Sequence, residues 1–233
     1  MALHRIFPHG RWRELLPGLW TIRGKINAPL YRNMVVVRLP SGELVIHSAI
    51  ALDDVGMAEL ETIGRPAYAV VPNAQHQRDA PFYASRYPGM QMICPAAARL
   101  EIRPVVPISA AAEEALPALG FKLHAVPGSK AMEYVYEYAL PSSDRVLIVN
   151  DMIFGPNATP ANLAGALMNM LLVGFRDRYG IARIYRRRMV TDMPALKRFI
   201  AGLSTVVGLK LVTISHGDPI TANPAAELRA IGA

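Results

Sequence analysis

Three apolar segments that each run directly into polar side chains constrain the fold of this chain more than any other feature. Residues 67–71, 145–149 and 209–215 are mostly apolar and have the length of buried strands. The polar residues that follow the three segments are, in chain order, Asn73, His76, Arg78 and Asp79, then Asn150 and Asp151, then His216 and Asp218. Because chemistry in open α/β sheets collects at the carboxyl ends of strands, we expect these side chains to line one site.

The first polar segment also has a purely structural interpretation. Asp79 stands two residues before Pro81, which is the arrangement of an N-cap residue and a proline in the first turn of a helix. On that view residues 73–79 form a polar turn that caps the next helix. The two later apolar segments also end in polar residues, which favours a site over the structural interpretation.

Strand and helix patterns alternate along the remainder of the chain. Residues 19–23, 33–39 and 44–47 predict antiparallel strands, and residues 53–63 have the spacing of a helix capped by Asp53 or Asp54. Further strands are expected at residues 90–94, 121–126 and 131–140, and further helices at residues 79–87, 113–119, 191–203 and 224–231. Residues 95–107 predict a connection with one short helix. With 233 residues, we expect one α/β domain over residues 1–233.

Composition narrows the partners and the compartment. A formal net charge of +7 favours anionic small molecules, nucleic acid or an acidic membrane surface. Cys94 is the only cysteine, which excludes an internal disulfide and fits a reducing compartment. The first nine residues lack the apolar core of a signal peptide, and the longest apolar stretch, residues 163–175, is shorter than the roughly 20 residues that span a bilayer. The expectation is a soluble cytoplasmic protein with an anionic small-molecule partner and no membrane partner.

Five local sequences, taken in order, resemble the metallo-β-lactamase fold. They are Gly42-Glu-Leu-Val-Ile-His47-Ser48, Ala69-Val-Val-Pro-Asn-Ala-Gln-His-Gln-Arg-Asp79, Val126-Pro-Gly-Ser129, Arg145-Val-Leu-Ile-Val-Asn-Asp151 and Ile214-Ser-His-Gly-Asp-Pro219. In particular, His47-Ser48 followed by the Asn-x-x-His motif resembles an uncharacterised bacterial branch of metal-dependent hydrolases. The resemblance implies a four-layer αββα sandwich over about residues 15–220.

The metal motif of that superfamily is only partly kept. Aligning its H-x-H-x-D-H motif on His76 places Ala74 at the first histidine, Arg78 at the aspartate and Asp79 at the last histidine, while Ser129 replaces a later histidine. The metal ligands that the resemblance implies are His76, Asp79, Asp151 and His216. The residues expected to line the substrate pocket are His47, Asn73, Arg78 and Ser129. His47 stands where the related strand carries an aspartate, and an imidazole there would orient a metal ligand.

Two functions follow from this residue set. The first is hydrolysis, because zinc or another divalent metal held by three protein ligands lowers the pKa of its bound water to about 7. The second is non-catalytic binding of an anionic small molecule by a metal-free protein. In that metal-free protein, Arg78 replaces the charge of the metal and pairs with Asp151. The two cannot be combined at low cost, because a guanidinium next to a divalent metal ion is repelled by it.

The segment from residue 163 to residue 188 has two unusual properties. Residues 163–175 are apolar nearly all round, which a helix tolerates only in a core, under a lid or against a second subunit, so a homodimer is one expectation. Six arginines follow, at positions 176, 178, 183 and 186 to 188. We expect a solvated surface there rather than a nucleic-acid interface, because aromatic residues are not interleaved with the arginines.

Overall fold

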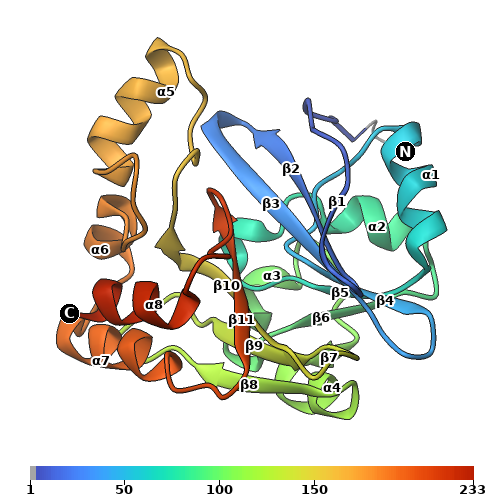
Figure 1. Cartoon of the computed structure of the whole chain (residues 1–233). Coiled ribbons are helices and arrows are strands. Elements are labelled where there is room, and N and C mark those ends of the chain that lie inside the picture. Colours follow the sequence, from blue (N-terminus) through green and yellow to red (C-terminus); the bar gives the residue numbers. More distant parts are fainter. Residues whose placement is uncertain (1–3) are drawn as a thin grey trace. The chain divides into compact units, whose positions relative to one another are not determined.

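A computed structural model describes residues 4–233 (Figure 1). The chain divides into two compact units. The first unit extends to Lys25 and continues from Asn33 to Gly120, and the second comprises Ile26–Arg32 and Phe121–Ala233. Whether they form the single domain expected from the sequence stays a prediction.

The first unit contains a sheet whose seven strands lie side by side in chain order. They are β1 (Arg13–Leu16), β2 (Leu19–Ile26), β3 (Ala28–Arg38), β4 (Glu43–His47), β5 (Arg65–Val70), β6 (Gln91–Cys94) and β7 (Ala110–Ala111). β1 pairs antiparallel with β2 and β3 with β4, whereas β4 to β7 pair in parallel. The parallel half of the sheet requires helical crossovers, and the expected helices supply them.

The helices of the first unit begin close to where the sequence predicts them. They are α1 (Asp54–Ile63), α2 (Ala80–Arg86), α3 (Arg99–Ile102) and α4 (Ala112–Ala118), with 3₁₀ turns η1 (Ala74–His76) and η2 (Ala96–Ala98). Asp53 caps α1 as expected, since its carboxylate accepts a hydrogen bond from the backbone N–H of Gly56 at 2.8 Å. Met57 and Leu60 on the same helix are fully buried.

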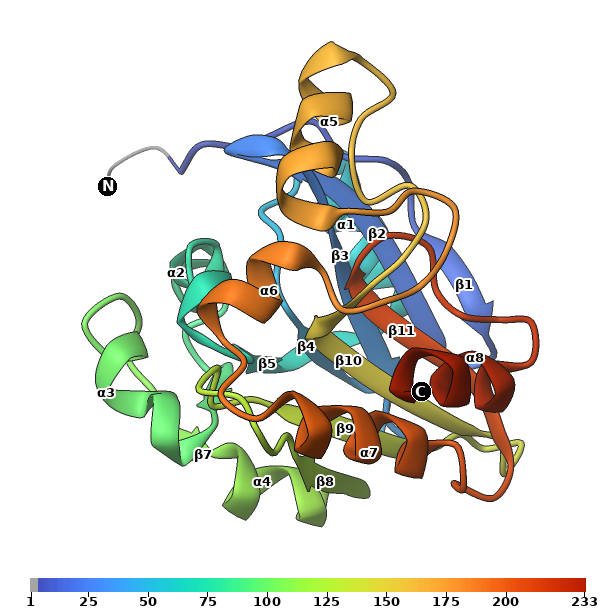
Figure 2. The same ribbon diagram turned by 90° about the vertical axis from the view of Figure 1, so that its left-hand side faces the viewer.

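The second unit contains a four-stranded sheet in the order β11-β10-β9-β8. Its strands are β8 (Phe121–Ala125), β9 (Tyr134–Ala139), β10 (Arg145–Phe154) and β11 (Leu209–His216). β8, β9 and β10 pair antiparallel, whereas β10 and β11 are parallel. The helices are α5 (Leu163–Met168), a π-helical turn η3 (Asn169–Val173), α6 (Arg183–Arg188), α7 (Met193–Leu203) and α8 (Pro224–Gly232) (Figure 2).

The core of the second unit forms where the helical stripe of α7 meets the strands. Leu196, Ile200 and Leu203 recur at helical spacing and are buried in one cluster with Leu147 of β10 and Val212 of β11. Asp192 caps α7 by accepting a hydrogen bond from the N–H of Ala195 at 2.9 Å. The sequence pattern therefore located both the core face and the start of this helix.

Several elements differ from the sequence prediction. β10 does not end at Val149 but continues to Phe154, so Asp151 lies inside the strand. Residues 163–175 are not one regular helix, because the last turn widens into η3. β1, β7 and α6 were not expected: β7 has only two residues, and the arginine run of α6 lacks an apolar stripe that would reveal a helix. Within residues 4–233, no helix combines the length and apolar character needed to cross a bilayer.

Gly128 provides a test of close packing in the second unit. Its φ is +65°, and a Cβ atom at this position would lie 2.2 Å from the carbonyl oxygen of Asp192. Gly128→Ala is therefore expected to lower the free energy of unfolding by about 1–3 kcal/mol, measured by urea denaturation. The control is Gly202→Ala on α7, where a Cβ meets nothing within 4 Å. That change is expected to be neutral or to stabilise by up to about 1 kcal/mol, and equal destabilisation by both would contradict the close approach.

Candidate metal site

Asp151 and His216 form a pair in the second unit. The Oδ1 atom of Asp151 lies 3.2 Å from Nε2 of His216, and both side chains are largely buried. The two residues come from neighbouring parallel strands at the point where the pairing becomes irregular. Val149 pairs with Ile214, and the next pair is Phe154 with His216. The register of Val149 with Ile214, continued by two residues, sets Asp151 beside His216 at the end of β11.

The imidazole of His216 is fixed from its other side. Its Nδ1 atom lies 2.6 Å from the backbone carbonyl oxygen of Tyr31, and its ring stacks on Phe154 with a centroid distance of 4.6 Å. Because a carbonyl oxygen only accepts hydrogen bonds, Nδ1 carries the ring proton that it donates. In the neutral imidazole, Nε2 then keeps a lone pair that faces the carboxylate of Asp151.

A buried polar network lies beside this pair. Asn150 donates to Oε2 of Glu133 at 3.0 Å and accepts from the hydroxyl of Ser215 at 2.6 Å. Oε1 of Glu133 lies 2.7 Å from the hydroxyl of Tyr185, which lies 2.8 Å from Oγ of Ser129. The backbone N–H of Asp151 also points at Glu133, at 3.5 Å. The network thus ties β10 to β11 through Ser215 and to the segment before β9 through Glu133.

Burial and a neighbouring negative charge act together on Glu133. Desolvation and the carboxylate of Asp151 raise the pKa of Glu133 from 4.5 to about 7, although the hydrogen bonds from Asn150 and Tyr185 oppose this rise. Burial raises the pKa of Tyr185, and the neighbouring carboxylates of Glu133 and Asp151 act in the same direction. Sequence reasoning named Asn150 among the polar strand ends but missed Glu133, Tyr185 and Ser215 as site residues. Ser215 gave a signal, as the polar residue that ends the apolar run before His216.

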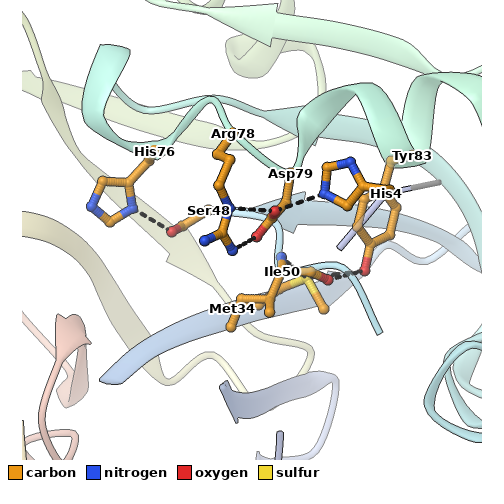
Figure 3. Close-up of polar contacts among 8 residues, drawn as sticks. All are labelled: His4, Met34, Ser48, Ile50, His76, Arg78, Asp79 and Tyr83. Carbon is orange, nitrogen blue, oxygen red and sulfur yellow. Dashed lines mark hydrogen bonds and ion pairs between the residues drawn. The ribbon is translucent and has the colours of Figure 1, made fainter. Parts of the chain in front are cut away.

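His76 is held in the first unit by a neighbouring hydroxyl. Oγ of Ser48 lies 2.6 Å from Nδ1 of His76, and both residues are buried (Figure 3). Ser48 follows β4 in the left-handed backbone conformation, with φ of 57°, and His76 ends the turn η1 after β5. Ser48 therefore engages His76 in the first unit, and the orienting part that the sequence assigned to His47 stays a prediction. His47 itself is buried at the end of β4, opposite Val70.

Arg78 and Asp79 form a bidentate ion pair. Nε and Nη2 of Arg78 donate to the two carboxylate oxygens of Asp79 at 2.8 and 2.7 Å, and His4 Nε2 lies 2.9 Å from Oδ1 (Figure 3). Asp79 is fully buried and makes no side-chain cap to α2. The pairing was not anticipated, and neither was His4. Its assignment as a metal ligand stays a prediction.

The remaining expected pocket residues have structural contacts of their own. Asn73 is buried and caps η1 by accepting a hydrogen bond from the N–H of Gln75 at 3.0 Å. Ser129 accepts from the N–H of Ala131 at 3.1 Å and joins the Tyr185 network. Their contact with a substrate stays a prediction, as does the expected Arg78–Asp151 ion pair.

Comparison with solved structures identifies the fold. A metallo-β-lactamase from Hirschia baltica matches with a TM-score of 0.60 and 14% identity, over 97% of this chain and 98% of that chain. FIM-1 from Pseudomonas aeruginosa, in a mono-zinc form, matches with a TM-score of 0.62 and 12% identity, over 97% and 96%. The chain has the metallo-β-lactamase fold. A third match, the DIM-1 metallo-β-lactamase exposed to ceftazidime, has a TM-score of 0.64 and 13% identity, over 98% of each chain.

The metallo-β-lactamase fold confirms the fold class expected from the sequence, an α/β protein with two mixed sheets and flanking helices. No family model matches the chain, and a search of curated proteins also finds no match. Sequence identities of 12–14% establish the fold alone. Function must therefore be argued from the residues of this chain.

The raised pKa of Glu133 predicts a dependence of stability on pH. The folded protein keeps a proton on Glu133 that the unfolded chain releases between pH 4.5 and about 7. Stability from this group is therefore present at low pH and is lost as the pH rises through about 7, by up to about 3 kcal/mol.

Glu133→Gln tests this dependence, because its amide mimics the protonated acid: the oxygen accepts from Asn150 and the NH₂ donates to Tyr185. The free energy of unfolding of chelator-treated protein, measured from about pH 5 to about pH 8, is expected to lose its downward slope in this variant. Glu101→Gln, on the surface of α3, is the control and should keep the slope of the wild type. An unchanged slope in Glu133→Gln would show that another group titrates.

Proposed function

We propose that this protein is a metal-dependent hydrolase that holds one divalent ion with His76, Asp151 and His216. The observation that carries the proposal is the pair of Asp151 and His216. The carbonyl of Tyr31 at Nδ1 directs the lone pair of Nε2 at a carboxylate oxygen 3.2 Å away. A divalent metal ion bound beside these two atoms would accept a ligand atom from each residue.

His76 is suited to be the third metal ligand, because its Nδ1 atom is also engaged by an oxygen. Ser48 engages its Nδ1 atom, so Nε2 is the nitrogen through which it would bind a metal. Metal-binding histidines in proteins almost always bond their second nitrogen to an oxygen, which fixes the orientation of the ring. Both histidines of the proposed site have this feature, each within its own unit. Their joint role is supported by the match to metallo-β-lactamases over nearly the whole chain.

Two histidines and one carboxylate make a catalytic type of metal site. Three protein ligands leave a coordination position open, whereas structural zinc sites use four. A bound zinc ion would lower the pKa of a water molecule to about 7 and provide a nucleophile near neutral pH. In this chain, Tyr31 and Ser48 would orient the two imidazoles, and the hydrogen bonds of Asn150 would hold the segment of β10 that carries Asp151. The formal charge of +7 favours an anionic small-molecule substrate.

The pairing of Arg78 bears on the alternative, a metal-free anion-binding protein. A guanidinium that replaced the metal would need to face Asp151, the carboxylate of the proposed ligand set. Arg78 instead donates two hydrogen bonds to Asp79, and its guanidinium also lies 4.6 Å from the ring centroid of Phe7. The charge of Arg78 is thus already matched by a buried carboxylate, which favours the hydrolase.

Asp151→Asn tests the metal site. The amide keeps the shape of the side chain but removes its charge, so zinc affinity is expected to fall by at least about 100-fold, more than the loss of an outer partner causes. Isothermal titration of the chelator-treated, untagged protein with zinc measures it. Asp144→Asn, in the turn between β9 and β10, is the control and should bind like the wild type. Equal affinities in Asp151→Asn and the wild type would refute the proposed ligand set.

Ser48→Gly tests the orienting hydroxyl. Glycine accepts the positive φ at this position, so the change removes the hydroxyl without adding backbone strain. Zinc affinity is expected to fall by about 10- to 100-fold. Ser143→Gly is a matched control, because Ser143 also has a positive φ, of 68°, but lies in an exposed turn. A loss of affinity in both variants, or in neither, would remove Ser48 from the site.

A further inference from the structure

The helical segment 163–173 presents its apolar side chains to solvent. Leu163, Leu167, Met170 and Leu171 stand at positions i, i+4, i+7 and i+8, and their exposed fractions are 88%, 50%, 59% and 51%. We call these four residues the apolar stripe. The buried residues of the same segment are Gly165, Asn169 and Val173. A surface helix of a globular protein normally buries its apolar stripe, so this orientation requires a partner.

A group of arginines adjoins the apolar stripe. This basic cluster consists of Arg176, Arg178, Arg183, Arg186, Arg187 and Arg188, all of which are exposed. Arg183 links it to the stripe by donating a hydrogen bond to the carbonyl of Met170 at 2.7 Å. Both views show α5 and α6 next to each other at one side of the second unit (Figures 1 and 2). A hollow of about 520 Å³ is lined by Arg183, Arg186 and Arg187 with Val190, Thr191 and Met193.

The charge of the basic cluster is not neutralised within the part of the chain that the structure describes. Among residues 4–233, no carboxylate forms an ion pair with any of its six arginines. Arg178 instead lies over the ring of Phe175, 4.9 Å from its centroid. The partner of this surface must therefore offer both an apolar phase and negative charge.

Three kinds of partner cover apolar or basic surfaces, and only one meets both needs. A second copy of this chain could cover the apolar stripe with its own, but its arginines would supply no negative charge to the basic cluster. Nucleic acid would neutralise the arginines but would leave the leucines in water. The surface of a bilayer with anionic lipids offers acyl chains to the stripe and phosphates to the arginines.

We propose that residues 163–188 bind the surface of membranes that contain anionic lipids, with the apolar stripe inserted below the phosphates and the basic cluster in contact with them. The sequence led us to expect no membrane partner, because no stretch is long enough to span a bilayer. A helix that lies in the membrane surface does not need that length. The proposal is independent of the metal site.

Vesicle flotation of the purified full chain tests the proposal. The wild type is expected to float with vesicles of phosphatidylcholine and phosphatidylglycerol in equal parts, and to remain in the dense fraction with phosphatidylcholine alone. Leu163→Ser combined with Leu167→Ser, and separately Arg186, Arg187 and Arg188 all changed to Gln, should each weaken binding by about tenfold or more. High salt should weaken binding of the wild type, because the attraction to lipid headgroups is screened.

Matched variants control for the loss of surface charge and apolar area. Gln at Arg38, Arg103 and Arg229 removes three exposed charges elsewhere, and Ser at Leu100 and Val207 removes two side chains that are 76% and 89% exposed. Both controls should float like the wild type, and circular dichroism shows that each variant is folded.

Three results would overturn the proposal. One is absence of flotation with the anionic vesicles. Another is a dimer in sedimentation that the Leu163 and Leu167 changes abolish, which would assign the stripe to a second copy. The third combines two findings. The protein binds generic RNA and loses this binding only when the three arginines are changed, while neither the leucine changes nor the arginine changes alter its flotation.

Discussion

The register between β10 and β11 is the constraint on which the proposed chemistry depends. Val149 pairs with Ile214 across these parallel strands, so the same register two residues later sets Asp151 beside His216. The hydrogen bond from Ser215 to Asn150 connects the strands one residue before this pair, and the register shifts after it, where Phe154 pairs with His216. Neighbouring parallel strands therefore place a carboxylate beside an imidazole at the carboxyl end of the sheet, where sites of α/β folds commonly form.

A hydrogen-bond partner at Nδ1 of each histidine is the second requirement. The carbonyl of Tyr31 fixes the tautomer of His216, and the hydroxyl of Ser48 fixes the ring of His76. Neither contact changes the charge of the site, but each removes rotational freedom from a side chain that would otherwise have to be ordered when a metal binds. Preorganisation of this kind improves affinity without any additional ligand.

Much of the fold was predictable from the sequence, because the decisive signals are local. The cap of α1 at Asp53, the buried stripe of α7 and the apolar runs of β5 and β11 follow directly from residue type and spacing. The register shift in β10 was not predictable, since the run from Val146 to Phe154 reads as apolar on both sides of Asn150 and Asp151. α6 was not predicted either, because four of its six residues are arginine and no apolar stripe marks it as a helix.

The candidate site was predictable only in part. His76, Asp151 and His216 could be named because they follow apolar runs, which is a pattern in the sequence. The partners that orient and surround them could not be named, because Glu133, Tyr185 and Tyr31 are distant in sequence from the residues they contact. Arg78 shows the opposite problem: it was assigned to a remote carboxylate, yet its closest ion-pair partner is the adjacent Asp79. One sequence shows which residue types are present but not the directions in which they point.

The backbone of Ser48 has a consequence for how this protein can be stabilised. A serine with φ of 57° carries strain of about 1 kcal/mol or more, which a glycine would relieve. Selection for heat resistance alone would therefore favour glycine at this position, whereas selection for an oriented His76 would retain the hydroxyl. Thermostable variants of this chain that keep serine here would show that function, and not folding, determines the residue at position 48.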